Sequence, residues 1–151
     1  MKRFILGLVC VLTYISYTSA QNWSEKLRKA VFSVITYSKD NKIIGTGNGF
    51  FINDNGEALS DYTLFKGASS ATVIDSKGNK FPVAFILGAS DLYDVVKFKV
   101  YLGDKKCDFL RASVEPAKVG ETVYLMPYTT QKSSVGTDGK VLSVSPIDSL
   151  Y

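Results

Sequence analysis

Between residues 30 and 100, short runs of β-branched and aromatic residues alternate with clusters of Asn, Asp, Ser and Gly. Such runs are typical of β-strands, and Asn and Gly in the breaks tolerate the positive φ of tight hairpins. Strands joined by tight turns predict antiparallel pairing, and six of them fit a closed barrel. We therefore expect an all-β fold, an antiparallel six-stranded barrel with strands at 30–38, 43–52, 57–60, 71–75, 80–87 and 94–100.

A short helix and a hairpin are expected on either side of this barrel. Asn22 and Glu25 have the spacing of a capping box, which predicts a short helix starting near Trp23. Two further β-rich runs, 121–126 and 140–145, are separated by a stretch rich in Ser, Thr and Gly. They predict a C-terminal β-hairpin with a long polar loop.

The first twenty residues have the pattern of a secretory signal peptide. Lys2 and Arg3 precede an apolar run over 4–17, and small residues follow up to Ala20, after which we expect cleavage. The alternative is a membrane anchor, but the run is shorter than the ~20 apolar residues of a spanning helix. Cys10 does not follow a small residue, so lipidation is not expected. The mature chain is predicted to be secreted or periplasmic, without stable membrane insertion.

The composition excludes several classes of function. The sequence has no histidine, and imidazole is the commonest general base and a usual zinc ligand. A self-sufficient Ser-His-Asp enzyme is therefore excluded, and neither a metal nor a cofactor is predicted. Loss of Lys2 and Arg3 with the signal peptide would lower the formal net charge from +4 to +2, which does not indicate a nucleic-acid partner. Cys107 would be the single remaining cysteine, so no intramolecular disulfide is expected.

Three motifs imitate ligand sites but favour structural roles. Gly45, Gly47 and Gly49 lack the spacing, the helix and the Lys-Ser pair of a phosphate-binding loop, so strand and hairpin geometry is expected there. The Asn-Asp-Asn-Gly segment 53–56 predicts a hairpin turn rather than a calcium loop. Cys107 has lysine neighbours that would lower the pKa of a thiol, but a lone cysteine without histidine is not expected to be a nucleophile.

Four motifs occur in order: G-T-G-N-G-F at 45–50, G-E-A-L-S at 56–60, Y-D-V-V-K-F-K-V at 93–100 and V-G-E-T-V-Y-L-M-P at 119–127. Together they resemble trypsin-like serine proteases of the HtrA/Deg type. In that family a glycine-rich hairpin precedes a strand ending in the catalytic histidine, and a T-D-L-A-V-L-K-I segment holds the catalytic aspartate. The resemblance implies a trypsin-like N-terminal β-barrel over 21–105, then a linker and the incomplete start of a second barrel over 106–151.

The departures from the family pattern decide the expected activity. Where the family reads T-N-[HN]-H-V-V, this chain reads S-D-Y-T-L-F at 60–65, which puts Thr63 at the histidine position. Asp94 matches the aspartate, and no G-N-S-G-G-P nucleophile loop is present. A threonine hydroxyl cannot accept a proton near pH 7 and return it to a leaving amine. The resemblance therefore implies a degenerate triad, with Thr63 and Asp94 close together at the barrel rim.

Two functions remain as expectations. The first is a secreted non-catalytic trypsin-like domain, a pseudoprotease that binds a protein or peptide. The second is a fragment of a serine endopeptidase whose C-terminal barrel, with the nucleophile, is missing from this chain. The predicted hairpin carries Val123, Leu125, Val141 and Val144 beside unpaired strand edges, so we expect it to fold against the barrel, self-associate or bind a partner.

Overall fold

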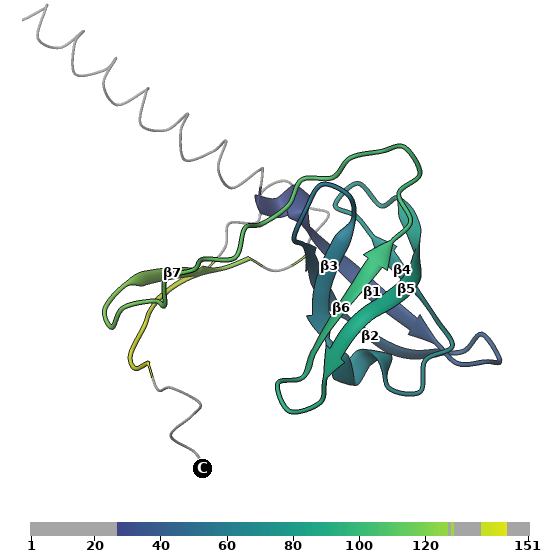
Figure 1. The fold of residues 1–151 in the computed structure, drawn as a ribbon, viewed down its shortest axis with the longest axis horizontal. Coiled ribbons are helices and arrows are strands. Elements are labelled where there is room, and N and C mark those ends of the chain that lie inside the picture. The colour runs from purple at the N-terminus through teal and green to yellow at the C-terminus, as the bar shows by residue number, and fades with distance from the viewer. Residues whose placement is uncertain (1–26, 127, 129–136, 145–151) are drawn as a thin grey trace, which may run out of the picture.

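The computed structural model describes residues 27–126, 128 and 137–144 (Figure 1). Residues 27–30 are helical and lead directly into the first strand. The predicted signal peptide, 1–20, and the predicted helix start near Trp23 lie outside the described residues. In the described ranges, no helix has the length and apolar character needed to cross a membrane.

The predicted barrel is confirmed. Six strands close into an antiparallel barrel in the order β1-β2-β3-β6-β5-β4 (Figure 1). They follow the predicted runs closely, and the largest difference is that β5 continues three residues further, to Ser90. The strands are β1 (Val31–Tyr37), β2 (Ile43–Phe51), β3 (Glu57–Asp61), β4 (Ser70–Ile74), β5 (Lys80–Ser90) and β6 (Val95–Val100), with a 3-10 turn η1 (Tyr62–Phe65) between β3 and β4.

The inner face of β2 consists largely of glycine. Because strand side chains alternate, Gly45, Gly47 and Gly49 share one face, and their β1 partners include the fully buried Val34 and Phe32. A Cβ on Gly49 would lie 2.5 Å from Cε2 of Phe32, and a Cβ on Gly47 would lie 2.3 Å from Cδ1 of Leu64. The G-x-G-x-G motif therefore makes room for larger side chains, in agreement with its predicted structural role.

Aromatic rings fill the space that these glycines leave. Phe32 contacts Phe51 with ring centroids 4.7 Å apart, and Phe98 contacts the Phe65 ring of η1 at 5.0 Å. Phe32, Phe51 and Phe98 are buried, whereas Phe65 is partly buried against the same core. Such tilted aromatic pairs contribute beyond their buried area, so η1 packs as part of the core.

The chain after β6 crosses the barrel at the end opposite η1 (Figure 1). Leu102, Cys107 and Phe109 are partly buried against the core. The Cys107 amide donates to the Asp54 carbonyl at 3.3 Å, and the Leu110 amide donates to the Phe51 carbonyl at 2.9 Å. The chain after β6 is therefore attached to the barrel as far as residue 110.

The C-terminal hairpin is present, but its second strand differs from the prediction. β7 (Thr122–Leu125) pairs with β8 (Thr137–Lys140), whereas a strand was predicted over 140–145. The register pairs Thr122 with Lys140, so residues beyond 141 would oppose the turn in which the Glu121 amide donates to the Lys118 carbonyl. That turn ends the ladder, so β8 begins three residues earlier than predicted, inside the expected loop, and shares only Lys140 with the predicted strand.

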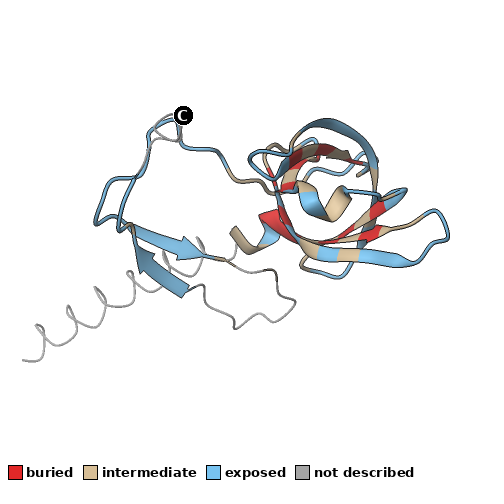
Figure 2. Ribbon diagram, turned by 90° about the horizontal axis from the view of Figure 1, so that it is seen from below, coloured by how far each residue is buried: buried red, intermediate tan, exposed pale blue. Residues whose placement is uncertain are grey.

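The hairpin lies apart from the barrel and is exposed on both strands (Figure 2). The buried residues line the barrel interior instead. Of the alternatives expected for the hairpin, packing of its two strands on the barrel is not seen, although the Tyr128 hydroxyl between them donates to the Asp75 carbonyl at 3.2 Å. Two strands alone bury little apolar surface, so the hairpin is marginal unless something covers it.

We predict that Gly49→Ala destabilises the barrel by about 2 kcal/mol or more, because the new methyl group overpacks Phe32 and meets the Leu59 carbonyl oxygen at 2.7 Å. Urea unfolding measures the loss. Gly88→Ala is the matched control, since no atom lies within 4 Å of a Cβ there. Equal stabilities for the two variants would contradict the packing role of the β2 glycines.

Candidate functional site

Thr63 and Asp94 meet at the rim of the barrel, as expected. The Thr63 hydroxyl donates to Oδ1 of Asp94 at 2.8 Å, and the Thr63 amide donates to the same oxygen at 2.6 Å. The Tyr62 amide donates to the Asp94 carbonyl at 3.1 Å. Asp61 offers no side-chain hydrogen bond to η1, so Asp94 supplies the acceptors for the start of this turn.

The Asp94 backbone is adapted to this role. Its φ is 49°, in the left-handed region that Asp and Asn enter more readily than other side chains. Hydrogen bonds from the side chain and then the backbone of Thr63 hold the pKa of the Asp94 carboxyl below its ordinary value. The exposed Asp94 is therefore a carboxylate at neutral pH.

Charged and aromatic groups flank this pair. Lys66 forms an ion pair with Asp91, and its ammonium lies 5.3 Å from the centre of the Tyr62 ring. The ion pair with Asp91 raises the pKa of Lys66. Sequence reasoning missed Lys66 and Asp91, which lie 25 residues apart and meet only because the barrel closes.

Neither Asp94 nor Lys66 at the rim is suited to proton transfer at neutral pH. Thr63 already donates its hydroxyl proton to Asp94, which is ionised. Lys66 is a cation in an ion pair. A general base needs a pKa near the working pH, and neither carboxylate nor ammonium here is shifted toward it.

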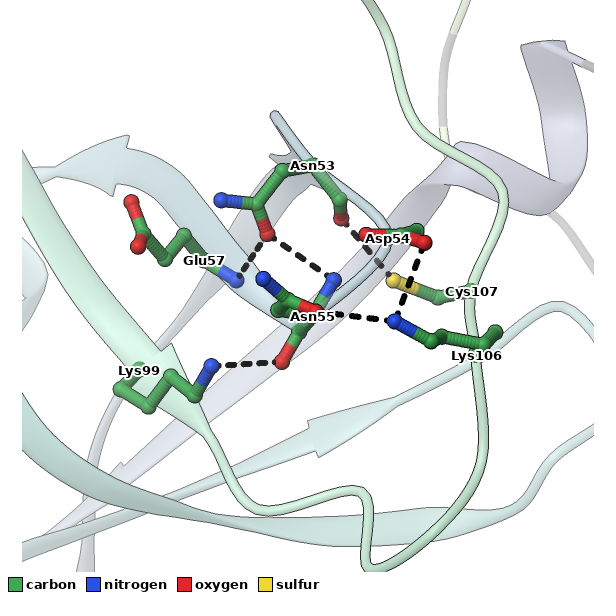
Figure 3. Close-up of polar contacts among 7 residues, drawn as sticks. All are labelled: Asn53, Asp54, Asn55, Glu57, Lys99, Lys106 and Cys107. Carbon is green, nitrogen blue, oxygen red and sulfur yellow. Dashed lines mark hydrogen bonds and ion pairs between the residues drawn. The ribbon is translucent and has the colours of Figure 1, made fainter.

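A second polar cluster lies at the β2–β3 turn (Figure 3). Oδ1 of Asn53 accepts the amides of Asn55 at 3.0 Å and Glu57 at 3.1 Å, which is an Asx turn. Lys106 donates to the Asn55 side chain at 3.0 Å and pairs with Asp54 at 3.1 Å. The segment predicted as a hairpin turn is one, and its polar groups fix the chain after β6.

Cys107 belongs to this cluster and is a structural thiol. Its Sγ donates to the Asn53 carbonyl at 3.2 Å (Figure 3), and it is free and half-buried. Burial raises the pKa of this thiol despite the lysines beside it in the sequence.

A cleft of about 280 Å³ opens nearby, lined by residues that include Lys77, Phe81 and Lys105.

Metal binding and known relatives give no further assignment. Across the described ranges, no three His, Cys, Asp or Glu side chains are grouped so that they could hold a metal ion. No protein-family model matches the sequence, and no curated protein matches it significantly. The functional argument therefore depends on the geometry of the chain itself.

We predict that Thr63→Val raises the pKa of Asp94 toward its ordinary value, because the hydroxyl donor is lost while the Thr63 amide donor is retained. An NMR titration of the carboxyl carbon measures this, and Thr63→Ser should keep the low pKa. Because the pKa of Asp94 is lower in the folded state than in the unfolded state, its ionisation stabilises the fold at any pH above the ordinary carboxyl pKa. This stabilisation is lost as the pH falls through the lowered pKa. The acid loss of stability should therefore be smaller in Thr63→Val. An unchanged pKa would contradict the hydroxyl contribution.

We also predict that Cys107 reacts slowly with a thiol-specific disulfide reagent at pH 8, about tenfold or more slower than the same chain in denaturant. The physical reason is its half-burial and raised pKa. Absorbance of the released thiolate follows the reaction. Equal rates for folded and denatured protein would show that the thiol is accessible and activated.

Proposed function

We propose that this chain is a secreted, non-catalytic trypsin-like domain, a pseudoprotease that acts by binding a protein or peptide. The observation that carries the proposal is the hydrogen bond from the Thr63 hydroxyl to Asp94, 2.8 Å long. If the resemblance to HtrA/Deg proteases holds, this bond stands where the family has its histidine and aspartate. On this proposal Asp94 corresponds to the aspartate of the triad, whereas Thr63 replaces the histidine base that the aspartate would orient.

Replacement of the base decides against hydrolysis. The step requires a group that takes the proton of a nucleophile and returns it to the leaving amine. Thr63 cannot do so near neutral pH, and the sequence has no histidine that might serve elsewhere. The rim is therefore suited to binding alone.

The alternative proposal is a fragment of a serine endopeptidase whose second barrel is supplied by another polypeptide. Such a barrel would contribute a nucleophile and an oxyanion hole. The base would still be missing, and loss of a triad member leaves only a residual ~10³–10⁴-fold catalysis over water. The binding function is therefore favoured.

The hairpin offers one surface for a partner. Val123, Leu125 and Val144 are exposed there, whereas Val141 is half-buried. Exposed apolar residues on a small sheet favour burial against another protein. Self-association through this hairpin is the competing use of the same surface.

We predict that the purified chain neither hydrolyses peptide bonds nor is labelled by a fluorophosphonate probe, because no base activates a nucleophile. Mass spectrometry of the intact protein measures labelling, with an active trypsin-like protease as the positive control. Thr63→His should remain inactive, since the family's nucleophile loop is also absent from the sequence. Stoichiometric labelling of a single serine would overturn the proposed function.

A further inference from the structure

The second half of β5 has an open edge. β4 pairs with β5 only from Ile74↔Lys80 to Thr72↔Pro82. On the other side, β6 pairs with β5 as far as Ser90↔Val95. Within the described part of the chain, residues 84–90 are thus strand-paired on one side alone, which leaves backbone donors and acceptors at the edge for another strand.

Two bulges shape this edge. The register with β6 shifts between Val83 and Phe85 and again between Ile86 and Gly88. Bulges bend a strand and redirect its side chains, and the first one follows directly after the end of the β4 pairing. As a result, three consecutive apolar side chains are exposed instead of alternating in and out: Phe85 at 56%, Ile86 at 49% and Leu87 at 45%.

The sequence of this edge lacks the usual charge protection. Residues 83–90 read V-A-F-I-L-G-A-S, without a charged residue or a proline. Native edge strands commonly carry lysine or proline, which prevent pairing with another chain. In residues 83–90 only the two bulges oppose pairing with another chain, so the edge remains open to strand addition.

The charges around the edge favour a second copy of the same chain. Lys99 lies opposite Phe85, and the cleft beside Phe85 is lined by Lys105 and Lys106 with one carboxylate, Asp104. At the other end, Asp91 and Asp94 follow Ser90. At the aspartate end, Lys66 is paired with Asp91, and Lys97, opposite Gly88, is paired with Glu57. Among the described residues this leaves the carboxylate of Asp94 without an ion pair. An antiparallel pair about a two-fold axis brings the lysine end of one edge toward the aspartate end of the other.

We propose that residues 84–90 of β5 pair antiparallel with the same residues of a second copy, forming a two-fold dimer through a sheet that continues across both barrels. Leu87, in the middle of the segment, lies near the axis. The contact is independent of the proposed pseudoprotease function, and the hairpin remains free for a different partner. The short edge is smaller than a standard protein interface, so the dimer is a weak, reversible one.

Sedimentation velocity over a concentration series of the mature chain, from about 10 µM to 1 mM, tests the proposal, since a weak interface dissociates in this range. We expect the average mass to rise from monomer toward dimer. Leu87→Lys and Leu87→Glu should each remain monomeric, because like charges meet at the axis. Their equimolar mixture should regain the dimer, since lysine then meets glutamate.

Matched controls locate the interface. Ile43→Lys changes a residue that is 62% exposed on β2, where β1 pairs with it and β3, which pairs only with residues 49–51, does not. It tests a different open strand edge and should leave the dimer unchanged. Leu125→Lys changes the hairpin, where Leu125 is 70% exposed, and should also leave it unchanged. Loss of the dimer in Leu125→Lys but not in Leu87→Lys would assign self-association to the hairpin and overturn the proposal.

Hydrogen exchange provides a readout on the unmodified chain. Amides at 84–90 should exchange more slowly as concentration rises, whereas those of β1, which pairs on both sides, should not change. A chain that is monomeric at 1 mM, with concentration-independent exchange at 84–90, would overturn the proposal even if the Leu87 variants fail to fold.

Discussion

The three glycines on the inner face of β2 are the constraint on which the barrel depends. A small six-stranded barrel has little interior volume. Large aromatic rings fit inside it only where the residues facing them on the opposite strand are small. Gly49 admits the Phe32 ring and Gly47 admits Leu64 of η1. The position of η1, and with it the position of Thr63, thus follows from glycines more than ten residues earlier in the chain.

The rim shows that a carboxylate can be held in a fixed position by hydrogen bonds from one turn. A carboxylate that accepts one hydroxyl and one amide from Thr63 is well ordered without any histidine. The position of Asp94 therefore has a structural explanation, because it accepts the hydrogen bonds at the start of η1.

Local signals in the sequence predicted most of the barrel, and failures occurred where distant segments decide the structure. Turn residues such as those at 53–56 predict the ends of strands well, because the strands of a hairpin are joined by residues close in sequence. The predicted start of β8 was wrong because the register of β8 depends on the turn before β7. The open edge of β5 was not predicted, because it depends on where β4 ends. The contact between Thr63 and Asp94 was expected only from the family resemblance, since strand spacing alone does not determine it.

The capping of η1 by Asp94 also has a consequence for the order of folding. Residues 62 and 63 both donate to Asp94, which is 31 positions after Thr63, and the N-terminal end of η1 has no local side-chain acceptor. A short 3-10 turn without such an acceptor does not persist alone, so η1 can form only after β6 has paired with β3. Pairing of β6 with β3 has by then already met the entropic cost of closing this loop. Packing of Leu64 against Gly47 is therefore a late step that stabilises a nearly complete barrel.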